Sequence, residues 1–122
     1  MEADVICIQE TRHFQGYAWA DHLLRNAGWF SSWSLGTTFM SQHHLRPGGT
    51  LLCWRHAWGK GKVVIKPNLN VVARLWDSVG IASFYDPPSH TDIEWFENLL
   101  NAFSGLDVPV YLVGDCNWVK KE

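Results

Sequence analysis

The sequence predicts a mixed fold of the α/β (α+β) class. Two apolar runs, one near each end of the chain, have the composition of buried strands. Two other stretches space their apolar residues as an amphipathic helix does, and several short β-type runs lie between them. The predicted order is therefore strand, helix, several strands, helix, strand.

The first part of the chain predicts a strand, a helix and a second strand. Residues 4–8 form a short apolar, β-branched run, and residues 9–15 are predicted to be a loop. Apolar residues recur at helical spacing over residues 17–27, and Gly28 is suited to end that helix. Residues 29–39 are rich in aromatic residues, Ser and Thr, and predict a strand with turns.

The middle of the chain predicts a meander of antiparallel strands. A turn signal at Pro47, Gly48 and Gly49 precedes the series, and Gly59 and Gly61 interrupt it. The four predicted strands cover residues 50–54, 62–66, 70–76 and 79–85.

A second helix and a last strand complete the predicted order. Thr91 and Glu94 match a capping box at the start of the helix. One apolar face follows at Ile93, Phe96, Leu99, Leu100 and Phe103. Gly105 ends the helix, and residues 110–113 form the last apolar strand.

Composition favours one globular domain inside the cell. The chain has 122 residues, 47% of them apolar, and contains no run of eighteen apolar residues that predicts a membrane span. The N-terminus is acidic and lacks the pattern of a secretory signal. Three cysteines without a C-x-x-C pair favour a reducing compartment, so we expect a cytoplasmic or nuclear protein without membrane partners.

Charge is unevenly distributed although the net charge is only −2. No Asp or Glu occurs between Asp21 and Asp77, and that stretch carries seven of the ten Lys and Arg residues. A phosphate-facing surface is one interpretation of this pattern. A solvated, lysine-rich sheet face is the other, and strand alternation alone accounts for Lys60 and Lys62.

Carboxylates directly follow the first and last predicted strands. Glu10 comes after the run DVICIQ, and Asp115 comes after VYLVG. A buried carboxylate needs a partner, because an unpaired buried charge costs much more free energy than one side chain's burial returns. A metal ion is one such partner, and α/β sheets often place their sites at strand ends.

Four blocks of sequence resemble, in order, motifs of the endonuclease/exonuclease/phosphatase superfamily. They are DVICIQET at residues 4–11, GGTLL at 48–52, ASFYDPPS at 82–89 and GDCN at 114–117. The superfamily includes deoxyribonuclease-I-like nucleases, abasic-site endonucleases and the endonucleases of non-LTR retrotransposons. Cys116 stands where the family usually has an aromatic or apolar residue.

The resemblance implies two packed mixed β-sheets flanked by helices, here an incomplete four-layer sandwich. It also implies a divalent-metal phosphodiesterase site in which Glu10 binds Mg²⁺, with Mn²⁺ as a substitute. Asp115 would orient or deprotonate the attacking water, Asn117 would donate its amide to a phosphate oxygen, and Tyr85 would offer its hydroxyl.

The resemblance therefore implies an endonuclease that hydrolyses DNA phosphodiester bonds, with nucleic acid as its partner. Arg46, from the acid-free stretch, and Trp118, which can stack on a base or sugar, are the predicted substrate-binding residues. The family's strand with a metal-site Asn and its Asp-His pair do not occur in the sequence, so residues 1–122 are predicted to be a partial domain.

Two alternatives stay open at the level of the sequence. The first is a catalytically inactive remnant or binding module with the same fold. The second is a phosphatase or phosphodiesterase that acts on small phosphoesters. Each site residue also has an ordinary structural interpretation, because Gly-Asp-x-Asn is a common turn composition and Tyr85 and Trp118 are suited to packing.

Overall fold

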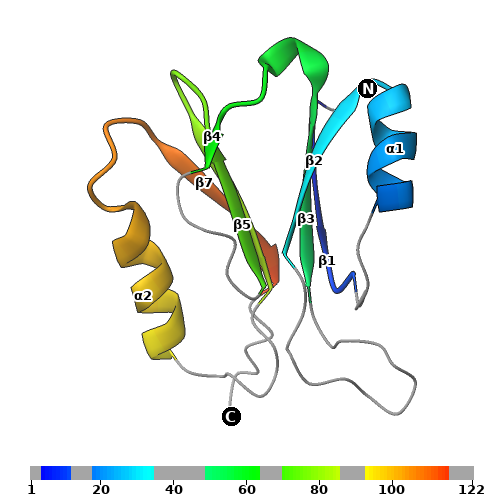
Figure 1. Cartoon of the computed structure of the whole chain (residues 1–122). Helices are drawn as coiled ribbons and strands as arrows, with labels where there is room; N and C mark the ends of the chain where they lie inside the picture. Colours follow the sequence, from blue (N-terminus) through cyan, green and yellow to red (C-terminus); the bar gives the residue numbers. More distant parts are fainter. Residues whose placement is uncertain (1–3, 12–17, 35–48, 64–69, 86–92, 116–122) are drawn as a thin grey trace, which may run out of the picture.

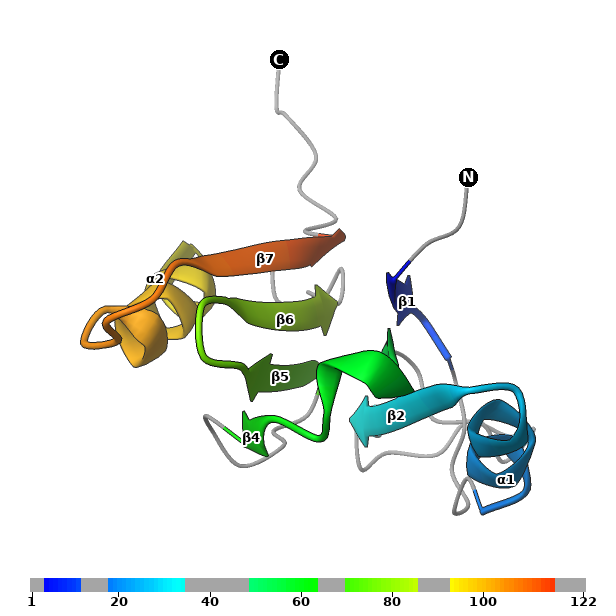
Figure 2. The same cartoon turned by 90° about the horizontal axis from the view of Figure 1, so that it is seen from above.

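The computed structural model describes residues 4–11, 18–34, 49–63, 70–85 and 93–115. Within these ranges the chain forms two β-sheets that lie face to face, with one helix outside each sheet (Figures 1 and 2). This arrangement confirms the predicted mixed class and its two packed sheets flanked by helices.

The first sheet contains three antiparallel strands in the order β1-β3-β2. The strands are β1 (Val5–Gln9), β2 (Trp29–Ser34) and β3 (Thr50–Arg55), and helix α1 (Ala18–Asn26) packs against β2. Strand β3 is central and almost wholly buried, which explains its uninterrupted run of apolar residues. Strand β1 lies at an edge, and its outward-facing Ile6 and Ile8 are exposed.

The second sheet contains four strands in the order β4-β5-β6-β7. The strands are β4 (Lys62–Val63), β5 (Val71–Leu75), β6 (Gly80–Tyr85) and β7 (Val110–Asp115). Neighbours are antiparallel except β6 and β7, which are parallel. Helix α2 (Ile93–Phe103) makes the crossover that a parallel pair requires and covers the outer face of this sheet (Figure 1).

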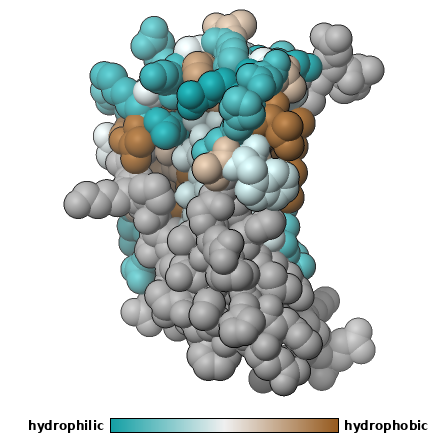
Figure 3. Space-filling view, turned by 45° about the vertical axis from the view of Figure 1, so that its right-hand side comes forward, coloured by the Kyte–Doolittle hydropathy of each residue, from teal (hydrophilic) through white to brown (hydrophobic). Residues whose placement is uncertain are grey.

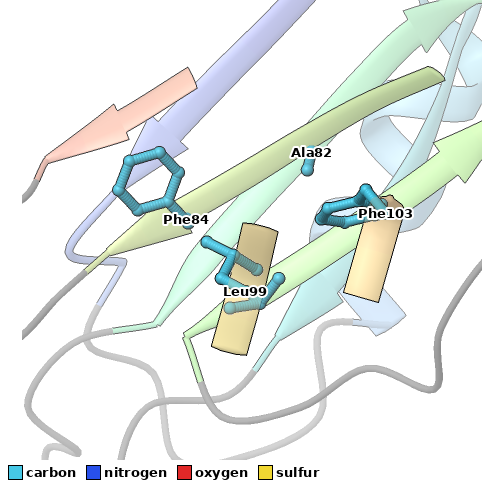
Figure 4. Close-up of a cluster of buried hydrophobic side chains, with 6 residues drawn as sticks. Ala82, Phe84, Leu99 and Phe103 are labelled. Carbon is cyan, nitrogen blue, oxygen red and sulfur yellow. The ribbon is translucent and has the colours of Figure 1, made fainter. Parts of the chain in front are cut away.

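Two apolar clusters join helix α2, the second sheet and the first sheet. Between α2 and the second sheet, Leu99 and Phe103 pack on Ala82 and Phe84 (Figure 4). Between the two sheets, Leu52 and Trp54 of β3 pack against strands β5 and β6. The side chain of Trp54 is 2% exposed, and its indole N–H donates to the Gly59 carbonyl at 2.7 Å.

The predicted meander is wrong in one respect. Strands β4, β5 and β6 form a meander, but β3 pairs with β1 and β2 in the other sheet. A short 3₁₀ helix, His56–Trp58, and the positive-φ residues Gly59 and Gly61 carry the chain from one sheet to the other. The glycines mark a change of sheet, where the sequence pattern predicted only a break within one meander.

The remaining differences concern single side chains. Leu100 was predicted on the buried face of α2 but is 44% exposed, whereas Leu99 and Phe103 are buried as predicted. On the face seen in Figure 3 the described surface is mainly hydrophilic, with separate hydrophobic patches. No helix in the described part of the chain is long and apolar enough to cross a membrane.

Candidate active site

Glu10 directly follows β1, at the end of the sandwich where β3 begins. Gln9 pairs with Thr50, and the Glu10 N–H donates to the Gly49 carbonyl at 2.9 Å. Glu10 is exposed and has a φ of 58°, which is unusual for a residue with a side chain. Such backbone outliers are concentrated at functional sites, because the surrounding structure must compensate for their strain.

Tyr85, in the second sheet, forms a hydrogen bond with the Glu10 carboxylate. It is the last residue of β6, its side chain is only 4% exposed, and its hydroxyl donates to Glu10 Oε1 at 3.0 Å. A hydrogen bond to a carboxylate is about twice as strong as one between neutral groups. Two predicted site residues that lie far apart in the sequence are therefore in direct contact across the two sheets.

Asp115 lies beside Tyr85 at the end of β7. The parallel register places Tyr85 opposite Asp115, and the Asp115 side chain is exposed. The preceding Gly114 lies against β6 so closely that a Cβ there would fall on the Phe84 carbonyl oxygen and within 2.7 Å of the Phe84 ring. The glycine of the Gly-Asp-x-Asn motif therefore allows β7 to carry Asp115 alongside Tyr85.

Buried polar side chains next to the site form hydrogen bonds between the two sheets. Thr50 and Ser83 are fully buried, and their hydroxyls contact each other across the two sheets. The Thr50 hydroxyl also donates to the Ile8 carbonyl at 3.0 Å, and the Gln9 amide donates to the Ser83 hydroxyl at 3.3 Å. Since buried polar groups are costly without partners, these bonds fix the spacing of β1, β3 and β6 near the site.

The sequence interpretation missed Asn70. It was treated as the first residue of a strand, but it precedes β5, is 5% exposed and has a φ of 66°. Its side chain accepts a hydrogen bond from the Gly49 N–H at 2.7 Å. The available signal was weak: asparagine is one of the few residues other than glycine that adopts this backbone conformation readily.

The two described thiols are unsuited to a role in catalysis. Burial raises the pKa of Cys7, although a hydrogen bond with Ser83 partly opposes the rise. Burial also raises the pKa of Cys53 to about 11, with further increases from Cys7 and Asp21. Both side chains therefore remain protonated at neutral pH, and a protonated thiol is a poor nucleophile and metal ligand.

The oxygen donors at this end of the sandwich suit a hard divalent cation. Carboxylate oxygens are the protein ligands that Mg²⁺ prefers, and this ion keeps several water ligands. Glu10 and Asp115 are both exposed, which leaves room for such waters. Among the described residues, no three His, Cys, Asp or Glu side chains are grouped so that they could hold an ion by themselves. The two exposed carboxylates provide the hard oxygen donors that such a water-rich cation prefers.

Two described arginines of the acid-free stretch, Arg55 and Arg74, pack against tryptophan rings. The guanidinium of Arg55 lies over the Trp29 ring at 4.1 Å, and that of Arg74 lies 5.4 Å from the Trp54 ring centre. Burial lowers the pKa of Arg74. These contacts are cation–π packing and do not support the interpretation of the two arginines as a phosphate-facing surface.

A cavity of about 840 Å³ lies at the opposite end of the sandwich. Its walls include Trp58, Lys62, Trp76 and Asp107, and none of the predicted site residues lines it. We place the candidate site at Glu10 because hydrogen bonds and strand register bring the predicted chemical groups together there. Three further predicted residues, Arg46, Asn117 and Trp118, lie outside the described residues.

Comparison with known protein families gives a match over nearly the whole chain. The family model described as "Endonuclease/Exonuclease/phosphatase family" matches residues 1–120, nearly the whole chain. No curated protein matches the chain. Members of the family are metal-dependent phosphodiesterases and nucleases that generally use divalent metal ions, and they act on nucleic acids or small phosphoesters. The chain belongs to the endonuclease/exonuclease/phosphatase family.

Proposed function

We propose that the protein is a Mg²⁺-dependent endonuclease that hydrolyses phosphodiester bonds in DNA, with Mn²⁺ able to replace Mg²⁺. The observation that carries this proposal is the hydrogen bond from the Tyr85 hydroxyl to Glu10 Oε1, beside Asp115. It joins a carboxylate from one sheet to a hydroxyl and a second carboxylate from the other, at one end of the sandwich.

Each residue has a separate role in this proposal. Glu10 holds the cation, which supplies Lewis-acid polarisation of a phosphoryl oxygen when bound. Asp115 accepts a proton from the attacking water or orients it. The hydrogen bond from Tyr85 orients the Glu10 carboxylate, as groups behind metal ligands commonly do. We also propose that the same hydroxyl contacts the phosphate.

The choice of DNA rests on sequence features. The Gly-Asp-Cys-Asn-Trp run and the tryptophan-rich middle resemble the endonucleases of non-LTR retrotransposons. Asn117 would donate to a phosphate oxygen, Arg46 would contact the backbone and Trp118 would stack on a base or sugar. We place this activity in the cytoplasm or nucleus, where the two described free cysteines would remain reduced.

A plasmid-nicking assay tests the proposal. Wild-type protein should convert supercoiled plasmid to the nicked form when Mg²⁺ or Mn²⁺ is present and should stop when EDTA is added. Glu10→Gln and Asp115→Asn remove one negative charge with little change in size, and each should slow nicking by at least about a hundredfold. Asp77→Asn is the matched control, because Asp77 is exposed at the opposite end of the sandwich and should be dispensable.

Other results would select another function. Hydrolysis of a small phosphodiester such as bis(p-nitrophenyl) phosphate, without nicking, would favour the small-phosphoester alternative. A folded protein that hydrolyses neither substrate would favour the inactive binding module. Nicking that survives both Glu10→Gln and Asp115→Asn would show that the activity arises elsewhere and would refute the assigned site.

A further inference from the structure

We propose that Asn70 is a positioning residue that holds Glu10 and Tyr85 in register across the two sheets. The inference rests on the proposed function for the roles of Glu10 and Tyr85. Asn70 itself is neither a predicted metal ligand nor a predicted contact with substrate. Its importance follows from the two groups that it binds.

Asn70 makes one hydrogen bond toward each sheet. Its side-chain Oδ1 accepts from the Gly49 N–H at 2.7 Å, on the side of the first sheet. Its main-chain carbonyl accepts from the Tyr85 N–H at 2.9 Å, in the second sheet. Both Asn70 and Gly49 are buried, so water cannot readily replace the side-chain bond.

Two further bonds close the chain of contacts into a ring. The Gly49 carbonyl accepts from the Glu10 N–H at 2.9 Å, and the Tyr85 hydroxyl donates to Glu10 Oε1 at 3.0 Å. The ring therefore runs from Glu10 through Gly49, Asn70 and Tyr85 back to Glu10. The main-chain hydrogen bonds fix the backbone positions of Glu10 and Tyr85. The hydrogen bond from the Tyr85 hydroxyl fixes the orientation of the Glu10 carboxylate.

Asparagine suits this position for two reasons. At a φ of 66° most side chains are strained, and asparagine is among the residues that tolerate this conformation. Its short side chain also presents a neutral acceptor to the Gly49 N–H. Glycine would keep the backbone but lose the acceptor, whereas aspartate would keep an acceptor and add a buried negative charge near Glu10.

A double-mutant cycle between Asn70→Gly and Tyr85→Phe tests the inference without relying on catalysis. Unfolding by urea is measured for the wild type, both single variants and the double variant in metal-free buffer. Tyr85→Phe should raise the equilibrium constant for unfolding about fivefold in the wild-type background and less than about twofold when Asn70→Gly is present. Independent effects, in which the two fold-changes multiply, would overturn the proposal.

Cation binding supplies the readout that a purely structural role would not change. The Mg²⁺ concentration at which half of the protein has bound the cation is measured for each variant by isothermal titration calorimetry. Asn70→Gly should raise this concentration about tenfold, Asn70→Asp should regain part of the loss, and the exposed control Asn101→Ala should leave it unchanged. An unchanged midpoint in Asn70→Gly, with wild-type protein responding normally, would also overturn the proposal.

The two readouts separate this inference from the proposed function. If the wild type shows neither nicking nor a response to Mg²⁺, the proposed function fails. The unfolding cycle then decides the positioning role alone: coupled effects support the ring of hydrogen bonds, and independent effects refute it.

Discussion

Substituting Gly114 with alanine should weaken both the fold and the site. A Cβ at this position would overlap the Phe84 carbonyl oxygen and approach two carbons of the Phe84 ring at 2.7 Å. The obstacle is mainly backbone, so β7 must move away from β6. Overpacking of this kind costs about 1–3 kcal/mol, and we expect Gly114→Ala at the upper end, about 3 kcal/mol, because a flexible side chain cannot relieve the overlap.

Thermal and urea unfolding measure this cost. For a chain of this length a loss of 1 kcal/mol lowers the melting temperature by about 4 °C, so Gly114→Ala should melt about 12 °C below the wild type. The matched control is Gly105→Ala. Nothing lies within 4 Å of a Cβ at Gly105, and its φ is outside the left-handed region, so the substitution should be nearly neutral.

The substitution also has a functional consequence, because Asp115 is the next residue. When β7 moves, the Asp115 carboxylate moves away from Tyr85, its neighbour in the parallel register. Nicking should therefore fall even at temperatures where Gly114→Ala is fully folded. An unfolding free energy for Gly114→Ala that equals that of Gly105→Ala would show that β6 and β7 do not approach so closely, and would refute the reasoning.

Three further predictions follow from the same contacts. Mg²⁺ or Mn²⁺ should raise the melting temperature of the wild type but not of Glu10→Gln, as measured by differential scanning fluorimetry, because a cation that binds only the native state stabilises it. Burial raises the pKa of the Cys53 thiol from 9.0 to about 11, so the unfolded chain loses this proton first as pH rises. Stability should be unaffected by this group below pH 9 and should fall by up to about 2 kcal/mol between pH 9 and 11, and Cys53→Ala should remove most of that fall in urea unfolding. Thr50→Val removes the hydroxyl that bonds to Ile8 and contacts Ser83, and should lower the free energy of unfolding by about 1–3 kcal/mol; a neutral effect would show that these buried contacts contribute little.

Local sequence signals predicted the helices and most strands well. Helix α2 ends at Phe103, close to the predicted stop at Gly105, because a helix is determined by residues within a few positions of each other. Helix α1 likewise ends just before Gly28. All residues of β6 are buried, as expected from its mainly apolar sequence.

Sheet assignment was less predictable because strand partners lie far apart in the chain. Strand β3 is followed closely by β4, and local pattern alone favours pairing the two. Its actual partners are β1 and β2, since only a central place buries both of its faces. Leu100 shows the same difficulty for side chains: helical periodicity places it at the margin of the apolar face, and only packing decides that it is exposed.

The candidate site divides in the same way. Glu10, Tyr85 and Asp115 were predictable because recognisable motifs contain them, and the structure places Tyr85 in contact with Glu10 and next to Asp115. Asn70 was not predictable, because its proposed positioning role depends on the backbone groups of Gly49 and Tyr85. A sequence motif identifies residues by their side-chain chemistry. It does not indicate which backbone N–H will donate a hydrogen bond to an asparagine side chain.

The two sheets are also consecutive in the chain, and this has a practical consequence. Every described strand of the first sheet precedes Gly59, and every described strand of the second follows Gly61. A cut between these glycines therefore leaves Glu10 on one piece and both Tyr85 and Asp115 on the other. Neither piece holds the pair of carboxylates alone, so restored nicking after mixing would report directly that the pieces had reassembled. With the proposed nicking activity as its signal, the protein therefore offers a design for a split reporter.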